Sequence, residues 1–364
     1  MCRPMRAGKM QQMVILKNHK GESMTVQLRE YREGDEEGMI SCIQDEYGDT
    51  YFRRELYDPE YIRKRAKEGG IVFLVAVTDR DEIAGMMLLK EFYPRESSCE
   101  IASQIFRIKY RGFGLAMPFF EYGMGILLSR LYSAALCLPV MFHNVTQRLL
   151  QRLKMHATGM FLNVFDLNRI THSYNNGRNK KHSQGIMVRA LEKKDAGTLY
   201  IPEEHGEFCR CIYGTLGAVG RFVEIGEQDA EAEPYEEVPT CSELEYTNDD
   251  MQKNLEIRVF RVGRDLEKRI TELYMRYPLR GRRTAVLLLN CNDAGAVWGY
   301  GILKKMGYFF TGLKPLCGGP EYMVLHHPGQ VKIFFCDYYT DGEFDALVRY
   351  IDDCYRQRCS NRTT

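Results

Sequence analysis

The stretch Ile-Phe-Arg-Ile-Lys-Tyr-Arg-Gly-Phe-Gly-Leu-Ala, residues 105–116, joins a predicted strand directly to a strongly apolar predicted helix. Two glycines, Gly112 and Gly114, stand in the connection. Glycine allows the backbone to turn so that successive N–H groups converge on one point, and the N-terminus of the following helix adds partial positive charge. The stretch therefore predicts a loop that binds a diphosphate, with Arg111 adding a charge-assisted hydrogen bond. A plain tight turn is the alternative interpretation.

The segments around the loop exclude two other phosphate-binding motifs. Residues 71–77, 83–92 and 99–108 predict three strands in close succession, which indicates an antiparallel meander. A dinucleotide-binding fingerprint would need a third glycine within a parallel strand-helix-strand unit, whereas position 117 is methionine. A P-loop would need Gly-Lys-Ser or Gly-Lys-Thr, and the stretch contains neither.

The elements that surround the loop predict an α/β fold with a mixed sheet. A strand at 24–32 and helices at 36–47 and 59–67 precede the meander. After the loop the sequence predicts a helix, a strand, a helix and a strand hairpin, at residues 115–130, 134–140, 144–155, 159–165 and 185–191. This order of strand, helix, strand and helix is typical of an α/β unit.

The loop resembles the acyl-coenzyme A binding loop of the GNAT N-acetyltransferase family, whose pattern is Gln/Arg-x-x-Gly-x-Gly/Ala. Arg111, Gly114 and Ala116 occupy the three defined positions. The resemblance covers about residues 24–191 and implies a GNAT fold that uses acetyl-CoA as the acyl donor. It implies that the pyrophosphate lies on the loop and the pantetheine arm along the preceding strand, which parts from its neighbour. The implied binding residues are Gln104, Ile105, Phe106, Arg111, Gly112, Phe113, Gly114, Leu115 and Ala116.

The resemblance also implies positions for catalysis. Glu100, near the start of the parted strand, is the implied base that removes a proton from the attacking amine. A solvated strand-edge glutamate is the alternative interpretation. The family's helix after the fifth strand opens with Asn, here the cofactor-binding candidate Asn144, and carries a tyrosine that protonates the departing thiolate. Leu150 or Gln151 stands at that position, depending on the register. Water can replace this acid, because most of the rate comes from holding amine and thioester together.

The C-terminal half resembles the end of a second GNAT domain. A strand at 286–290, a helix, and the segment 303–312 with Gly307 before three aromatic residues follow the family's order. The basic stretch 280–283 leads into a strand rather than a helix, so it lacks the helix dipole of a phosphate loop. We expect a degenerate repeat that binds no coenzyme. Its expected role is one wall of an acceptor cleft, or a scaffold or dimerisation module.

The expected organisation has four parts. Residues 224–250 are rich in acids and contain no Lys or Arg, which marks a boundary between domains. The predicted parts are a flexible extension at 1–23, a GNAT acetyltransferase domain at 24–192, a helix and acidic linker at 193–250, and a degenerate GNAT-like domain at 251–364. Predicted elements of the last part include strands at 322–326 and 331–335 and a closing helix at 343–355.

Composition limits the expected partners and location. Lys and Arg number 50 against 49 for Asp and Glu, so no overall field would attract nucleic acid or an anionic membrane. The apolar stretch 113–128 contains Glu121 and is shorter than the roughly 20 residues that a bilayer span needs. The 12 cysteines form no C-x-x-C pair, which favours reduced thiols in the cytoplasm and no metal site.

These features together predict transfer of an acetyl group from acetyl-CoA to an amine of a small molecule or protein, by direct attack in a ternary complex. A noncatalytic acyl-CoA sensor or protein-interaction module is the alternative, because the tyrosine is missing and the repeat is degenerate. Aminoacyl transfer from tRNA is a third hypothesis, which the neutral charge balance disfavours.

Overall fold

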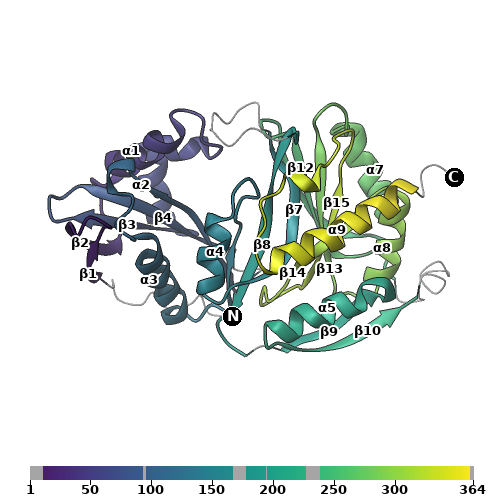
Figure 1. Cartoon of the computed structure of the whole chain (residues 1–364). Helices are drawn as coiled ribbons and strands as arrows, with labels where there is room; N and C mark the ends of the chain where they lie inside the picture. Colours follow the sequence, from purple (N-terminus) through teal and green to yellow (C-terminus); the bar gives the residue numbers. More distant parts are fainter. Residues whose placement is uncertain (1–10, 93–95, 167–177, 194, 227–237, 361–364) are drawn as a thin grey trace. The chain divides into compact units, whose positions relative to one another are not determined.

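The computed structural model describes residues 11–92, 96–166, 178–193, 195–226 and 238–360 (Figure 1). These residues form two compact units, and the boundary in the sequence lies between Cys137 and Leu138. Each unit, taken by itself, contains a mixed sheet together with helices. The predicted α/β fold class is therefore confirmed.

The sheet of the first unit contains six strands in sequence order. Neighbouring strands are antiparallel except β5 and β6, which run parallel and are connected through helix α3. A parallel pair requires such a crossover. The predicted antiparallel meander is confirmed as β3, β4 and β5. The strands are β1 (Gln11–Lys17), β2 (Ser23–Glu30), β3 (Ile71–Thr78), β4 (Ile83–Glu91), β5 (Ser98–Phe106) and β6 (Ala134–Cys137).

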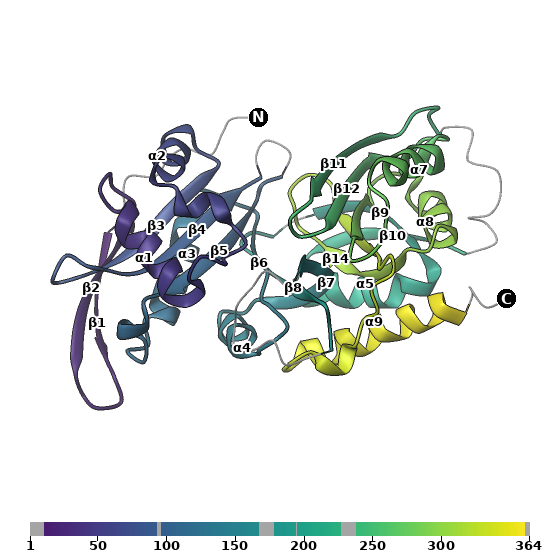
Figure 2. The ribbon, with the colours of Figure 1, turned by 90° about the horizontal axis from the view of Figure 1, so that it is seen from above.

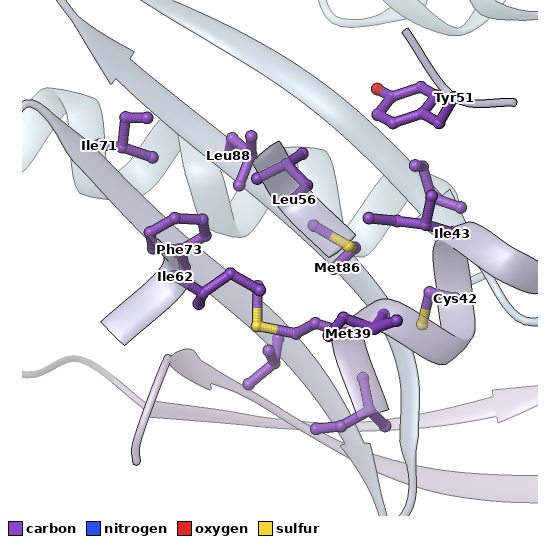
Figure 3. Packing of buried hydrophobic residues seen from close by; sticks show 14 of the residues in the cluster. Met39, Cys42, Ile43, Tyr51, Leu56, Ile62, Ile71, Phe73, Met86 and Leu88 are labelled. Carbon is purple, nitrogen blue, oxygen red and sulfur yellow. The ribbon is translucent and has the colours of Figure 1, made fainter. Parts of the chain in front are cut away.

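Helices α1 (Glu36–Tyr47) and α2 (Pro59–Glu68) pack on one face of this sheet. Strand residues two apart share a face, and Phe73, Met86 and Leu88 form one buried cluster with apolar side chains of both helices (Figure 3). Complete burial of such a side chain contributes about 1.5–3 kcal/mol. This cluster fixes α1 and α2 against the strand that leads into the loop.

Helix α3 (Ala116–Ser129) packs on the opposite face of the same strands. Gly123 lets the helix approach the sheet closely, because a Cβ atom there would lie 2.6 Å from Cε of Met87 and 3.6 Å from Cδ2 of Leu89. The predicted long apolar helix is confirmed, and its N-terminus begins directly after the glycine loop.

The sheet of the second unit has the strand order β8-β7-β14-β15-β13-β12-β11. Its neighbouring described strands are antiparallel except β12 and β13, which are connected through α7. The strands are β7 (His156–Asp166), β8 (Lys181–Ala190), β11 (Glu243–Asp249), β12 (Asn254–Arg261), β13 (Thr284–Asn290), β14 (Phe309–Lys314) and β15 (Tyr322–His327).

The described residues of this unit also form α-helices and a small second sheet. The helices are α4 (Val145–Arg152), α5 (Glu203–Thr215), α7 (Leu266–Arg276), α8 (Ala296–Lys305) and α9 (Glu343–Ser360). Strands β9 (Asp195–Pro202) and β10 (Val219–Ile225) pair in parallel, and α5 lies beside them (Figure 2). Helix α9 contacts β14 and β7.

Strands β7 and β14 meet at a single pair of glycines, Gly159 and Gly312. The residue before each glycine is a threonine that bonds to the opposite strand. Thr158 Oγ1 donates to the carbonyl of Leu313 at 3.0 Å, and Thr311 Oγ1 donates to the carbonyl of Met160 at 2.9 Å. This reciprocal contact ties the hairpin of β7 and β8 to the strands of the C-terminal half.

The predicted loose extension at 1–23 is wrong for residues 11–17, which form β1 in full register with β2. A side-chain turn closes this hairpin: Asn18 Oδ1 accepts the amides of Lys20 and Glu22, and Gly21 has φ +82°. Residues 1–10 lie outside the described part of the chain.

The predicted strand at 331–335 is also wrong. The amide of Val331 donates to the carbonyl of Pro328, and the amide of Phe334 donates to Oδ1 of Asn179. These two amides therefore donate to a turn carbonyl and to a side chain, and not to a neighbouring strand. The expected linker at 193–250 contains β9, α5, β10 and β11 in its described residues, and residues 227–237 lie outside them.

Candidate functional site

The glycine loop lies between β5 and α3 in the first unit. Gly112 has φ +85° and Gly114 has φ +78°, a left-handed conformation that favours glycine. A Cβ atom at either position would meet nothing within 4 Å. The glycines are therefore required by the backbone conformation, and the space in front of them is open.

The amides that follow Arg111 in this loop have no partner in the described part of the chain. Arg111 N donates to the carbonyl of Ile108 at 3.1 Å, but no hydrogen bond is made by the amides that follow, those of Gly112, Phe113, Gly114, Leu115 and Ala116. Helix α3 also lacks a side-chain cap. Unsatisfied amides at a helix N-terminus, together with the helix dipole, form an anion site.

Two side chains attach the loop to its surroundings. Gln104 Nε2 donates to the carbonyl of Ala116 at 3.1 Å, which joins β5 to the first turn of α3. The guanidinium of Arg111 forms an ion pair with Glu46 and donates to the carbonyl of Phe106 at 3.2 Å. A diphosphate on the loop would compete with Glu46 for Arg111.

Strands β5 and β6 part after three residue pairs. The ladder ends where Glu100 faces Leu136, and β6 itself ends at Cys137, whereas β5 continues to Phe106. Ser103, with φ +50°, lies in a β-bulge of β5. Among the described residues of this unit, no strand pairs with the β6 side of β5 beyond Glu100.

A buried tyrosine lies at the bulge. Tyr51, from the segment after α1, donates its hydroxyl hydrogen to Ser103 Oγ at 2.8 Å. Burial raises the pKa of Tyr51, so its hydroxyl stays protonated at neutral pH. Neither residue was singled out from the sequence, because the fold brings them together from positions far apart in the chain.

Glu100 is buried, with a side chain that is 7% exposed. Its Oε1 lies 3.6 Å from Nη2 of Arg53, and its Oε2 lies 3.8 Å from Nζ of Lys90. The alternative interpretation of a solvated strand-edge glutamate is therefore wrong. A buried carboxylate at the point where two strands part is a suitable position for a base.

Asn144 lies in the second unit, directly before α4, and its side chain makes no capping hydrogen bond. Leu150 is fully buried in α4. The role of Asn144 in cofactor binding stays a prediction of the sequence resemblance.

The connection before α7 in the second unit differs from the glycine loop. Val262 N donates to Oδ2 of Asp293 at 2.6 Å, Gly263 N to Oγ of Ser242 at 3.0 Å, and Arg264 N to the carbonyl of Pro239 at 2.9 Å. Strands β12 and β13 stay paired over six residues. The amides are satisfied and the strands are closed, so this connection offers no anion site.

A cavity of about 910 Å³ lies in the second unit, among α5, α8, α9 and the start of β14. His205 lies at its wall, with Nδ1 2.8 Å from the hydroxyl of Tyr350 and Nε2 2.8 Å from that of Tyr300. Burial lowers the pKa of His205 to about 4, so the imidazole is neutral at pH 7. The sequence alone does not single out His205, because a lone histidine carries no motif.

The described residues contain no group of three or more His, Cys, Asp or Glu side chains placed to hold a metal ion. None of their helices is both long and apolar enough to cross a membrane.

No family model matches the chain, and no curated protein matches it. Solved N-acetyltransferase structures are similar to part of it. The spermidine/spermine N-acetyltransferase SpeG from Vibrio cholerae shares 14% identity over 46% of this chain and 95% of its own, with a TM-score of 0.37. The ribosomal-protein-S5-alanine acetyltransferase from Vibrio fischeri shares 10% over 46% of this chain and 93% of its own, with a TM-score of 0.37. The function is therefore inferred from the geometry of the site.

Proposed function

We propose that the chain is a GNAT-type N-acyltransferase that transfers an acetyl group from acetyl-CoA to an amine by direct attack in a ternary complex. The observation that supports this most is the row of free amides from Gly112 to Ala116, next to a pair of strands that part. In a purely structural turn the amides would be bonded within the protein. The connection before α7 in the same chain is such a case, because its amides are bonded to side chains.

The proposed donor site has two parts. The diphosphate of acetyl-CoA accepts hydrogen bonds from the loop amides and from Arg111, which leaves Glu46. The pantetheine arm follows the unpaired side of β5 along Gln104, Ile105 and Phe106, and the carbonyl of Phe106 becomes available when Arg111 turns to the diphosphate. The thioester then lies near the bulge at Ser103.

The proposed reaction uses Glu100 as the base. Glu100 takes one proton from the acceptor's ammonium group and the nitrogen attacks the thioester carbon. The carbon–sulfur bond then breaks, and the second proton lost by the nitrogen passes through water to the departing thiolate. Placing amine and thioester side by side accounts for most of the barrier reduction. The missing tyrosine of α4 therefore lowers the efficiency without preventing turnover.

The experiment is calorimetric titration of the full chain with acetyl-CoA. We expect one site per chain, since the connection before α7 is closed. Gly112→Asp should lower the affinity at least about 100-fold, because a carboxylate beside the phosphates adds repulsion and the helix dipole is opposed. Gly112→Asn should retain most of the affinity, because Asn tolerates positive φ and carries no charge.

Gly21→Asp is a matched control, because Gly21 has φ +82° and open surroundings in the same unit. It should leave the affinity for acetyl-CoA unchanged. Equal affinity of wild type and Gly112→Asp would exclude the loop as the diphosphate site.

A noncatalytic acyl-CoA sensor is the second candidate, favoured by the missing tyrosine, since Leu150 or Gln151 stands at the family's position depending on the register. Release of free thiol from acetyl-CoA distinguishes the two functions. An amine that accelerates this release supports the transferase, whereas tight binding without release for any amine supports the sensor.

We also infer a cytoplasmic location. The cysteines in the described part of the chain are all free thiols, and several are buried, such as Cys42, Cys99 and Cys137. Free thiols persist in a reducing compartment.

A further inference from the structure

Arg53, Lys90 and Glu100 form a charged cluster in the first unit, on the face of the sheet that α1 and α2 cover. Lys90 of β4 is the cross-strand partner of Glu100 of β5, so both side chains lie on one face. Arg53 comes from the segment between α1 and the short 3₁₀ helix Arg54–Tyr57. The fold thus brings three charges from three segments together where β5 and β6 part.

Glu100 of this cluster is buried, whereas Arg53 is partly exposed and the Lys90 side chain is 39% exposed, and no hydrogen bond joins the three charges. Glu100 is 7% exposed and Arg53 17% exposed, yet their closest approach is 3.6 Å, which is longer than a hydrogen bond. Lys90 is also too far from Glu100, at 3.8 Å. In the described part of the chain the guanidinium of Arg53 makes no hydrogen bond, and its Nε atom is fully buried.

Buried polar side chains in folded proteins are nearly always hydrogen-bonded, and a guanidinium offers five donors. Arg53 therefore has donors ready for a ligand. The planar guanidinium matches a carboxylate, which accepts two parallel hydrogen bonds from it.

We propose that Arg53 and Lys90 bind a carboxylate of the acceptor, whose amino group lies against Glu100, so that the acceptor is a small amino acid. This rests on the proposed acyltransferase function. The three charges sum to +1, which one carboxylate neutralises, whereas a phosphate would bring nearly two negative charges. The close approach of Arg53 and Glu100 requires that only a few bonds separate the acid from the amine.

The experiment compares matched amines as acceptors in the thiol-release assay with acetyl-CoA and the full chain. Glycine, β-alanine and γ-aminobutyrate are paired with ethylamine, propylamine and butylamine, which replace the carboxylate by a methyl group. At least one amino acid should exceed its alkylamine in kcat/KM by about 10-fold or more.

Arg53→Gln should lower kcat/KM for that amino acid about 10- to 100-fold more than for its alkylamine, mainly through KM. Arg54→Gln is the matched control, because Arg54 is the adjacent, exposed arginine, and it should change neither substrate. Lys90→Gln serves as a second variant should Arg53→Gln not fold, and it should act in the same direction.

The outcomes separate this inference from the function on which it rests. Acetyl transfer to alkylamines as fast as to amino acids, or an equal loss for both in Arg53→Gln, would overturn the acceptor class while the transferase stands. Failure of acetyl-CoA to bind by calorimetry would overturn the transferase itself and this inference with it.

Discussion

At the scale of single residues, the position of Glu100 decides how the proposed site would work. Its carboxylate lies at the last pair of β5 and β6, almost without access to water, and two cations approach it without hydrogen bonds. A substrate amine that entered the gap would therefore find an acceptor with free lone pairs.

Replacement of this carboxylate tests its role as base. Glu100→Gln should slow acetyl transfer about 100-fold or more at fixed pH, because general-base catalysis contributes about 10²–10⁴-fold. Its affinity for acetyl-CoA should stay within about two-fold of wild type, because Glu100 does not contact the loop. Single-turnover thiol release measures the first effect and calorimetry the second.

Glu55→Gln is the control, since Glu55 is an exposed carboxylate near the same segment. It should react at the wild-type rate. A wild-type rate for Glu100→Gln as well would remove Glu100 as the base.

His205 provides a prediction on stability. Its folded pKa of about 4 is below the unfolded value of about 6.5, so the unfolded chain binds a proton between these pH values and the folded chain does not. Stability from this group is complete above about pH 6.5 and is lost as the pH falls to about 4, by about 3 kcal/mol in total.

Urea unfolding of wild type and His205→Gln at several pH values between 7 and 4 measures this. The difference in unfolding free energy between the two proteins should shrink as the pH falls. Both proteins contain the nearby pair of Glu204 and Lys304, so its contribution largely cancels when the two are compared at the same pH. A difference that is constant with pH would contradict the buried neutral imidazole.

At the scale of elements, the two halves use the same connection in opposite ways. In the first unit α3 joins the parallel strands β5 and β6, and in the second unit α7 joins β12 and β13. Before α3 the amides are free, whereas before α7 they bond to Asp293, Ser242 and Pro239. A helix N-terminus alone is therefore no ligand site, and the free amides make the difference.

The crossing of β7 and β14 also depends on single glycines. A Cβ atom on Gly312, which has φ +115°, would lie 2.3 Å from Cα of Gly159 and 2.6 Å from the carbonyl oxygen of Thr158. Gly312→Ala should lower the unfolding free energy by about 3 kcal/mol, from backbone strain and overpacking together. Urea unfolding of the full chain measures this.

Gly281→Ala is the matched control, because Gly281 has φ +62° with nothing within 4 Å of its Cβ position. It should cost only about 1 kcal/mol. A Gly312→Ala protein as stable as the control would mean that the strands do not meet as described.

The elements of the sequence differed in how well they could be predicted. Long segments rich in apolar residues, such as α3 and strand β3 of the meander, were predicted, since their composition indicates a buried element by itself. Strand β1 was missed because most of its residues are exposed, so its sequence lacks the alternation of a half-buried strand. Its pairing with β2 is visible only in the structure. The strand expected at 331–335 failed because Asn179, far away in sequence, takes the amide of Phe334.

The candidate site divides in the same way. The loop of Gly112 and Gly114 is contiguous, so its conformation could be predicted from local residue types. Arg53, Lys90 and Tyr51 could not be predicted, because only the folded sheet brings them to Glu100 and the bulge. Their individual sequence surroundings carry no motif.

At the scale of the whole molecule, the predicted GNAT domain at 24–192 includes residues of both compact units. The reason is the pairing of β7 with β14, which attaches residues 138–166 to strands of the C-terminal half. That residues 24–192 act together as one acyltransferase domain stays a prediction. Strand β14 of the C-terminal half thus pairs with β7 of the predicted GNAT domain, while the amides in the connection before α7 are bonded within the protein.

Hydrogen–deuterium exchange of the full chain, with and without coenzyme A, tests the free loop amides most directly. Without ligand, the amides of residues 112–117 should exchange within the shortest time measured, and those of residues 262–264 should exchange more slowly, because they are bonded. Coenzyme A should protect residues 112–117 and leave residues 262–264 unchanged. Binding of coenzyme A without protection of residues 112–117, or with protection at residues 262–264 instead, would contradict the account.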